Sequence, residues 1–101
     1  MTIEYIRYEL SSHTPDQFKD GYARAALALK SAPECLGYEI TQCEEAATVF
    51  VVRIHWESTQ AHLNGFRTGP YFADFYRDVA PFFKDIAEMR HYATTDLVWS
   101  R

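Results

Sequence analysis

The sequence is short of the residues that break or cross-link a chain, with four glycines, four prolines and two cysteines among 101 residues. It has no low-complexity segment, internal repeat or linker, so we expect a single domain over residues 1–101 with one core. Cys35 and Cys43 both lie in one predicted strand. A strand of that length extends roughly 26 Å at about 3.3 Å per residue, which is beyond the reach of a disulfide.

Basic charge and long apolar runs are also scarce. The net charge is -4, the pI is about 5.5, and the ten Lys and Arg residues are scattered. Phosphate binding needs a basic surface, so we expect no nucleic-acid partner. No apolar run approaches the ~18 residues of a membrane span, and the N-terminus lacks the basic-then-apolar order of a signal peptide. A cytoplasmic protein with no membrane partner is therefore predicted.

Apolar and aromatic residues, in contrast, are plentiful. Hydrophobic residues make up 48% of the chain and aromatic residues 16%. Such a chain is far from the disordered class, and its aromatic side chains must be buried in a core, a pocket or an interface.

Hydrophobic spacing predicts four strands and two helical stretches. Thr14 and Pro15 form a typical helix start. Gly65, Gly69 and Pro81 should break the second helical stretch. The predicted order is βαββαβ, a ferredoxin-like α+β fold with a four-stranded antiparallel sheet and helices on one face. The expected strands cover residues 2–10, 35–43, 48–56 and 86–97, and the helical stretches cover 14–31 and 58–83.

Strand alternation divides the side chains between two faces of this sheet. The second face mixes apolar residues with charges of both signs, which suits either a solvated sheet or a paired interface. The face expected to pack under the helices holds Ile6, Tyr8, Leu36, Tyr38, Ile40, Phe50, Val52, Ile54, Trp56, Met89 and His91. The opposite face holds Tyr5, Arg7, Glu39, Thr41, Val49, Val51, Arg53, His55, Glu88, Arg90 and Tyr92.

One segment resembles a known family. The run from Ile54 to Leu63, with Trp56-Glu57-Ser58 at the junction of strand and helix, is similar to a signature of the antibiotic biosynthesis monooxygenases, and Phe66 and residues 70–76 continue it. The resemblance covers nearly the whole chain in element order. It implies a homodimer in which two sheets pack face to face as a dimeric α+β barrel, with the mixed face as the interface.

The family includes cofactor-free oxygenases of aromatic substrates, haem-degrading enzymes and members without an established reaction, so membership does not decide the chemistry. In the haem-degrading branch the resemblance implies a haem-ligating His where this chain has Tyr76, and a Trp where it has Phe66. The strand at residues 2–10 also lacks that branch's Asn. Haem degradation is therefore disfavoured, although a tyrosinate can ligate haem iron.

No cofactor or metal is expected from the motifs. The four glycines form no GxGxxG, and the four histidines show no metal-ligand spacing. An oxygenase of this kind would use an electron-rich phenolic substrate as its own reductant, which requires an aromatic cavity, a base and proton donors. The oxygenase class that the resemblance implies, together with the absence of these motifs, thus predicts a cofactor-independent monooxygenase that acts on a small phenol- or quinol-like molecule.

The expected cavity lies between the sheet and residues 58–83. His91 is the predicted base, because a strand His among apolar neighbours would have a pKa near or below neutrality. Trp56 and Tyr76 are the other predicted catalytic residues. The predicted substrate-binding residues are Tyr8, Tyr38, Phe66 and Phe72. Aromatic residues at such spacing more often pack in the core than line a site. For His91 a core hydrogen bond is as ordinary a role as that of a base.

The remaining histidines have other expected places. His62 is predicted to face solvent from its helix, His13 to lie in the turn before the first helix, and His55 to lie on the surface or interface.

Two other classes of function remain open. The same topology serves non-catalytic ligand-binding or regulatory dimers, which would keep the pocket but have no titratable group at the ligand. An RNA-recognition domain shares the βαββαβ order, yet Thr48 to Trp56 lacks the basic, glycine and exposed aromatic positions of its third strand.

Overall fold

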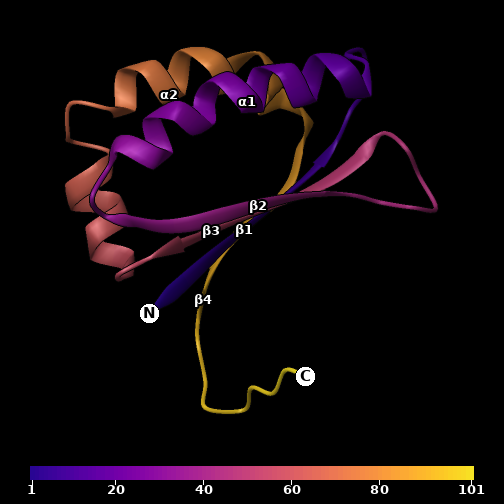
Figure 1. Ribbon diagram of the computed structural model, residues 1–101. Helices are drawn as coiled ribbons and strands as arrows, with labels where there is room; N and C mark the ends of the chain where they lie inside the picture. The colour runs from indigo at the N-terminus through magenta and orange to yellow at the C-terminus, as the bar shows by residue number, and fades with distance from the viewer.

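The computed structural model describes residues 1–101 and has the predicted ferredoxin-like α+β fold (Figure 1). None of its helices combines the length and the apolar character of a membrane-spanning segment. The elements are β1 (Thr2–Glu9), α1 (Pro15–Ser31), β2 (Cys35–Gln42), β3 (Val49–Trp56), the π-helix η1 (Ala61–Phe66), α2 (Phe72–Val79), the 3₁₀-helix η2 (Ala80–Asp85) and β4 (Ile86–Ala93).

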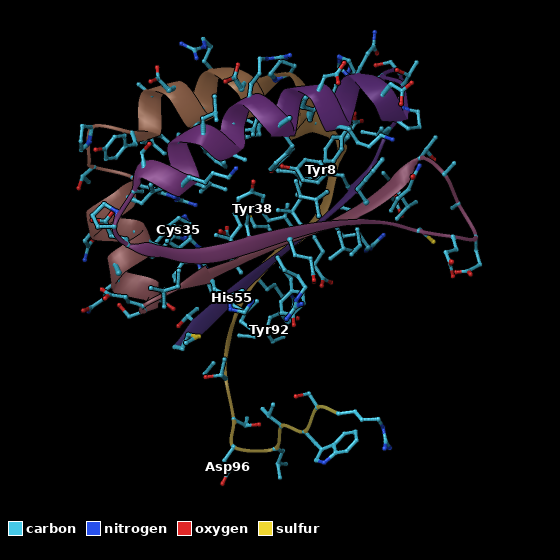
Figure 2. All side chains as sticks on the ribbon, in the orientation of Figure 1. Tyr8, Cys35, Tyr38, His55, Tyr92 and Asp96 are labelled. Carbon is cyan, nitrogen blue, oxygen red and sulfur yellow. The ribbon has the colours of Figure 1, made fainter.

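The four strands form one antiparallel sheet in the order β2-β3-β1-β4, and α1 and α2 cover one of its faces (Figure 1). Tyr8 and Tyr38 point to the helical side, whereas His55 and Tyr92 point away from it (Figure 2). The predicted division of side chains between two faces is therefore confirmed at these positions. Every second residue of β1 and β3 is buried on the helical side.

Helix α1 begins and ends where its sequence predicts. Thr14 accepts a hydrogen bond from the Gln17 backbone N–H at 3.1 Å, and the Gln17 side chain accepts one from the Thr14 backbone N–H at 2.9 Å. This capping box pairs backbone donors that the helix itself leaves free. Phe18, Tyr22 and Leu29 on the inner face of α1 are fully buried, so the helix is held against the sheet by apolar packing.

Two details of the strands differ from the prediction. A β-bulge between Cys35 and Gly37 shifts the register of β2, so Leu36 is 51% exposed instead of packing under the helices. Strand β4 ends at Ala93 and not near Leu97, which is exposed in a C-terminal segment that extends away from the sheet (Figure 1).

The helical region from Ser58 to Asp85 is broken into three pieces. The Ser58 side chain accepts a hydrogen bond from the Ala61 backbone N–H at 2.9 Å, at the start of η1. Helix α2 begins at Phe72, and the α-helical pattern stops before Pro81, as predicted. Short segments with different axes cannot cover the sheet as one long helix would, and a cavity remains beneath them.

Candidate functional site

A cavity of about 500 Å³ lies between the sheet and the broken helices. Twelve of its fifteen lining residues are hydrophobic. Tyr8 and Trp56 line it from the strands, and Phe72, Phe75 and Tyr76 line it from α2. Its size and apolar lining are typical of sites that bind small organic molecules.

The cavity has one polar end, which contains Glu4, His62 and Arg67. The Glu4 and His62 side chains are almost completely buried, whereas Arg67 is exposed. The His62 ring stacks on the indole of Trp56, with ring centroids 4.4 Å apart and planes 8° apart. His62 Nδ1 and His91 Nε2 are hydrogen-bonded at 2.8 Å.

Trp56 and Glu4 complete this cluster. The Trp56 indole N–H donates to Glu4 Oε1 at 3.1 Å, and His62 Nε2 lies 3.8 Å from the same oxygen. The order of groups is therefore Trp56, Glu4, His62 and His91, running from the core toward the edge of the sheet.

The sheet register explains why these groups meet. Glu4 on β1 is directly opposite His91 on β4, and both side chains point to the helical side. Directly opposed residues of antiparallel strands have Cβ atoms about 4.5–5.5 Å apart. His62 reaches the same point from η1, the π-helix that follows β3. Single π-helical turns occur frequently at functional sites.

Burial controls the charges in this cluster. Burial, together with the nearby charges of Arg67 and His91, lowers the pKa of His62 to about 4. Burial and Arg67 also lower the pKa of His91. Burial raises the pKa of Glu4, although the Trp56 hydrogen bond and Arg67 act in the opposite direction. Near neutral pH both imidazoles are therefore uncharged, so one ring donates an N–H to the bond between them and the lone pair of the other ring accepts it. When His62 is the donor, its Nε2 lone pair is available to accept a proton.

A pair of tyrosines lies deeper in the core. The Tyr8 and Tyr22 hydroxyls are hydrogen-bonded at 2.6 Å, and both residues line the cavity. Burial raises the pKa of Tyr8 to about 12 and raises that of Tyr22 well above its usual range. Both phenols thus remain protonated, and they are hydrogen-bond donors rather than bases.

Four of the predicted site residues line the cavity: Tyr8, Trp56, Phe72 and Tyr76. Phe66 lies behind this lining, fully buried against Trp56 with ring centroids 5.1 Å apart. Tyr38 lies outside the cavity, because β2 is the strand farthest from β4 and its side chain borders separate hollows.

The predicted base, His91, is half-buried at the edge of the sheet and reaches the cavity through its hydrogen bond to His62. The expectation that His62 faces solvent is wrong, since its side chain is buried against Trp56. The sequence held a signal for this position, because His62 precedes the inward-facing Phe66 by four residues, a spacing that places two helical residues on one face.

Glu4, Arg67 and Phe75 are further cavity residues that the sequence reasoning did not select. Glu4 shares its strand phase with Ile6 and Tyr8, so a charged residue on an apolar face was a visible signal. Arg67 had no comparable signal, because it follows the π-helix, whose turn the sequence did not predict.

Chemically, the site combines an aromatic cavity with a neutral imidazole pair and, at the same polar end, the guanidinium of Arg67. A neutral imidazole can accept a proton from a bound hydroxyl group. The guanidinium of Arg67 can stabilise the anion that forms. Glu4, His62 and His91 also each offer one atom of a type that binds metal ions, and these three atoms lie close together.

Comparisons with known proteins agree with this architecture. Residues 1–78 match the family model described as antibiotic biosynthesis monooxygenase. No curated protein matches the chain. A Bordetella bronchiseptica protein described as a candidate antibiotic biosynthesis monooxygenase has a TM-score of 0.74 and 22% identity, covering 93% of this chain and 96% of its own.

Two other solved structures are similar in fold. A variant of SnoaB, a cofactor-independent oxygenase from Streptomyces nogalater, has a TM-score of 0.79 and 13% identity, covering 96% of this chain and 95% of its own. A conserved protein from Methanosarcina mazei has a TM-score of 0.74 and 12% identity, covering 93% of this chain and 92% of its own. At these identities the structural likeness establishes the fold alone.

Proposed function

Because the chain belongs to the antibiotic biosynthesis monooxygenase family, we propose that it is a cofactor-independent monooxygenase whose substrate is a small, electron-rich phenol or quinol. The similarity in fold to SnoaB, a cofactor-independent oxygenase, supports this class of reaction. The fold alone does not define chemistry. The observation on which the proposal rests is the aromatic cavity with His62 at its polar end.

The cavity suits a planar aromatic ring. Its volume of about 500 Å³ is sufficient for a small organic molecule, and Phe72, Phe75 and Tyr76 offer aromatic edges and faces to it. A ring bound among these walls would direct a hydroxyl group toward the polar end. His62 there is neutral at pH 7 and can accept the hydroxyl proton, and Arg67 attracts the resulting phenolate.

The proposed reaction is balanced without a cofactor. Proton removal gives a phenolate that is rich enough in electrons to reduce dioxygen. In a phenol, the ring carbon para to the phenolic oxygen changes from C–H to C=O. In a quinol, whose para carbon already carries oxygen, a neighbouring ring C–H becomes C–OH as the ring is oxidised to the quinone. In both cases the product receives one oxygen atom, and the other oxygen atom leaves as water. The substrate supplies all four electrons. His62 holds the hydroxyl proton and can pass it to His91, which is nearer to solvent.

Oxygen uptake by metal-stripped protein tests this proposal. We expect that aerobic incubation with a panel of phenols and quinols consumes one dioxygen per product formed, and that mass spectrometry with ¹⁸O₂ finds one labelled atom in the quinone. Uptake that requires an added flavin or metal would contradict the cofactor-independent reaction.

The same experiment separates the runner-up function, a non-catalytic ligand-binding or regulatory dimer. Such a protein would bind the aromatic ligand in the cavity, with quenching of Trp56 fluorescence, but it would consume no oxygen. Binding without uptake across the whole panel would favour this alternative.

We also propose that two copies of the chain pack through the sheet faces that point away from the helices. Tyr5 and Tyr92 pack edge to face there at 5.2 Å, and the Arg53 guanidinium lies 5.4 Å from the centre of the Tyr5 ring. Arg53 also forms an ion pair with Glu39. A shallow hollow of about 420 Å³ includes Val51 on this face. Aromatic and Arg side chains with few unpaired charges are typical of protein interfaces.

Replacing Val51 with Glu should weaken this dimer. The half-buried valine would become a carboxylate near its own symmetry copy. Arg7 lies directly opposite on β1 but is already paired with Glu9, so the added charge is buried at the interface without a partner of its own, which is unfavourable. We expect the dissociation constant from sedimentation equilibrium to rise at least about tenfold, equivalent to ~1.4 kcal/mol. Ala23→Glu, which adds the same charge on the exposed side of α1, is the control. A wild-type protein that is monomeric at micromolar concentration would refute the interface.

A further inference from the structure

Three metal-ligand side chains converge at the polar end of the cavity, although they come from three separate elements. Glu4 is on β1, His62 on η1 and His91 on β4. One carboxylate oxygen and one nitrogen from each ring all lie within 4.8 Å of one another. Glu4 and His62 are buried and His91 is half-buried, so this cluster differs from the exposed acidic groups that are common on protein surfaces.

The distances are close to those of a coordination sphere. Two nitrogens bound to one Zn²⁺ at about 2.1 Å would lie roughly 3.0–3.4 Å from each other. His62 Nδ1 and His91 Nε2 are 2.8 Å apart, so an opening of a few tenths of an ångström would admit an ion between them. Glu4 needs no new backbone position, because it is already paired with His91 across β1 and β4.

The groups behind these ligands also suit a metal site. The Trp56 indole N–H holds Glu4 Oε1, and the stacked Trp56 ring holds His62 in one orientation. Ligating carboxylates and imidazoles are ordinarily fixed by such outer hydrogen bonds and packing. The cluster is therefore pre-organised on two strands and a packed helix, instead of on a mobile loop.

We propose that Glu4, His62 and His91 form a binding site for one divalent transition-metal ion. Two imidazole nitrogens and one carboxylate oxygen suit Zn²⁺, Fe²⁺ and Co²⁺ better than Mg²⁺ or Ca²⁺, which prefer oxygen alone. Three protein ligands leave at least one coordination position free, and Glu4 and His62 line the cavity. The free position thus faces the cavity, where water or an oxygen-donor ligand can occupy it.

One charge opposes this ion. Arg67 lies close enough to Glu4, His62 and His91 to influence all three electrostatically. Its side chain is exposed and makes no ion pair, so it can turn toward solvent when a cation enters. Replacing Arg67 with an uncharged residue should consequently strengthen metal binding. Such a variant tests the site by a gain of affinity instead of a loss.

This inference goes beyond the proposed oxygenase and does not depend on it. A bound ion would use the imidazole lone pairs that the proposed base needs. Turnover is therefore measured on metal-stripped protein and metal binding on protein without substrate, so either result can fail alone.

Calorimetric titration of metal-stripped protein with Zn²⁺ tests the site. We expect one ion per chain and a melting temperature that rises with Zn²⁺ concentration. Disturbing only the groups behind a metal ligand typically costs about 10- to 100-fold in affinity, so Glu4→Gln and His91→Gln should each weaken binding at least that much. Arg67→Gln should bind more tightly, and His13→Gln, outside the cluster, should bind as the wild type does.

Cobalt provides the spectroscopic readout. Co²⁺ added to the wild type should give visible d–d bands that Glu4→Gln and His91→Gln reduce, whether or not those variants turn over substrate. The proposal is overturned if the folded wild type binds no Zn²⁺ with a micromolar or lower dissociation constant, or if His13→Gln weakens binding as much as His91→Gln does.

Discussion

Replacing His62 with Gln is expected to lower turnover of a phenolic substrate by about 10²- to 10⁴-fold, the usual contribution of a positioned base. His62 is the imidazole that lines the cavity, and its ring is held between Trp56 and His91. Glutamine is similar in length and keeps a hydrogen-bonding group for His91, but it cannot accept a proton at neutral pH. Circular dichroism should therefore show that the variant is folded, while an oxygen-uptake assay should show almost no turnover.

His91→Gln should have a smaller effect on turnover. His91 does not line the cavity, so it acts on the substrate only through its 2.8 Å hydrogen bond to His62. The sequence predicted His91 as the catalytic base. We expect instead that His62 accepts the proton and that His91 supports it through their hydrogen bond. Measuring turnover and melting temperature on the same metal-stripped samples separates catalysis from stability, with His13→Gln as the control.

Two results would contradict this assignment. If His91→Gln abolishes turnover and His62→Gln does not, the base is His91 and the substrate binds nearer to the sheet edge. If both variants lose stability by about 1–3 kcal/mol but keep normal turnover, the pair is a buried hydrogen bond of the core and not a catalytic group.

The fold was predictable from the sequence because its main signals are local. Thr14, Pro15 and Gln17 begin α1 by their own side-chain chemistry, and Pro81 ends the α-helical pattern of α2. The alternation in β1 and β3 is regular, so the face that each residue occupies follows from its parity.

The sequence-based predictions failed at two places, a β-bulge in β2 and the π-helix η1. The bulge between Cys35 and Gly37 is a property of strand pairing, and it moved Leu36 from the core to the surface. The π-helical turn at η1 has no established sequence rule, and it determines where Arg67 leaves the helix. In both places the type of element was predicted correctly, as a strand and a helix. The positions of Leu36 and Arg67 depended on tertiary contacts that the local sequence does not encode.

The polar cluster could be recognised only after folding. Glu4, His62 and His91 are separated by dozens of residues, so no ligand-spacing motif connects them. Only the register of β1 against β4, together with the path of η1, brings their side chains to one point. The sequence did predict the helical side of the sheet near Trp56 as the region of the site, which is where the cluster lies.

Lowering the pH is expected to reduce the free energy of unfolding through the titration of this same cluster. Between pH 6.5 and 4 the unfolded chain protonates His62 while the folded protein resists it, because burial lowers the folded pKa to about 4. The unfolded state then binds more protons, so the free energy of unfolding falls as the pH falls. This contribution is complete above pH 6.5 and amounts to about 3 kcal/mol when fully lost.

Glu4 should act in the opposite direction. Its folded pKa is raised by burial, so the folded protein binds a proton that the unfolded chain releases. The stability from Glu4 is complete below its unfolded pKa near 4.5 and is lost as the pH rises through the folded pKa. On acidification Glu4 therefore offsets part of the loss caused by His62.

Urea unfolding of metal-stripped protein from pH 7 to pH 4 checks both signs, using differences between each variant and the wild type to cancel the other titrating groups. His62→Gln should lose less stability on acidification than the wild type by up to about 3 kcal/mol. Glu4→Gln, which can still accept the Trp56 hydrogen bond through its amide oxygen, should lose more than the wild type. Parallel curves for the wild type and His62→Gln would mean that His62 is free to protonate in the folded protein, and would remove the buried neutral imidazole from the site.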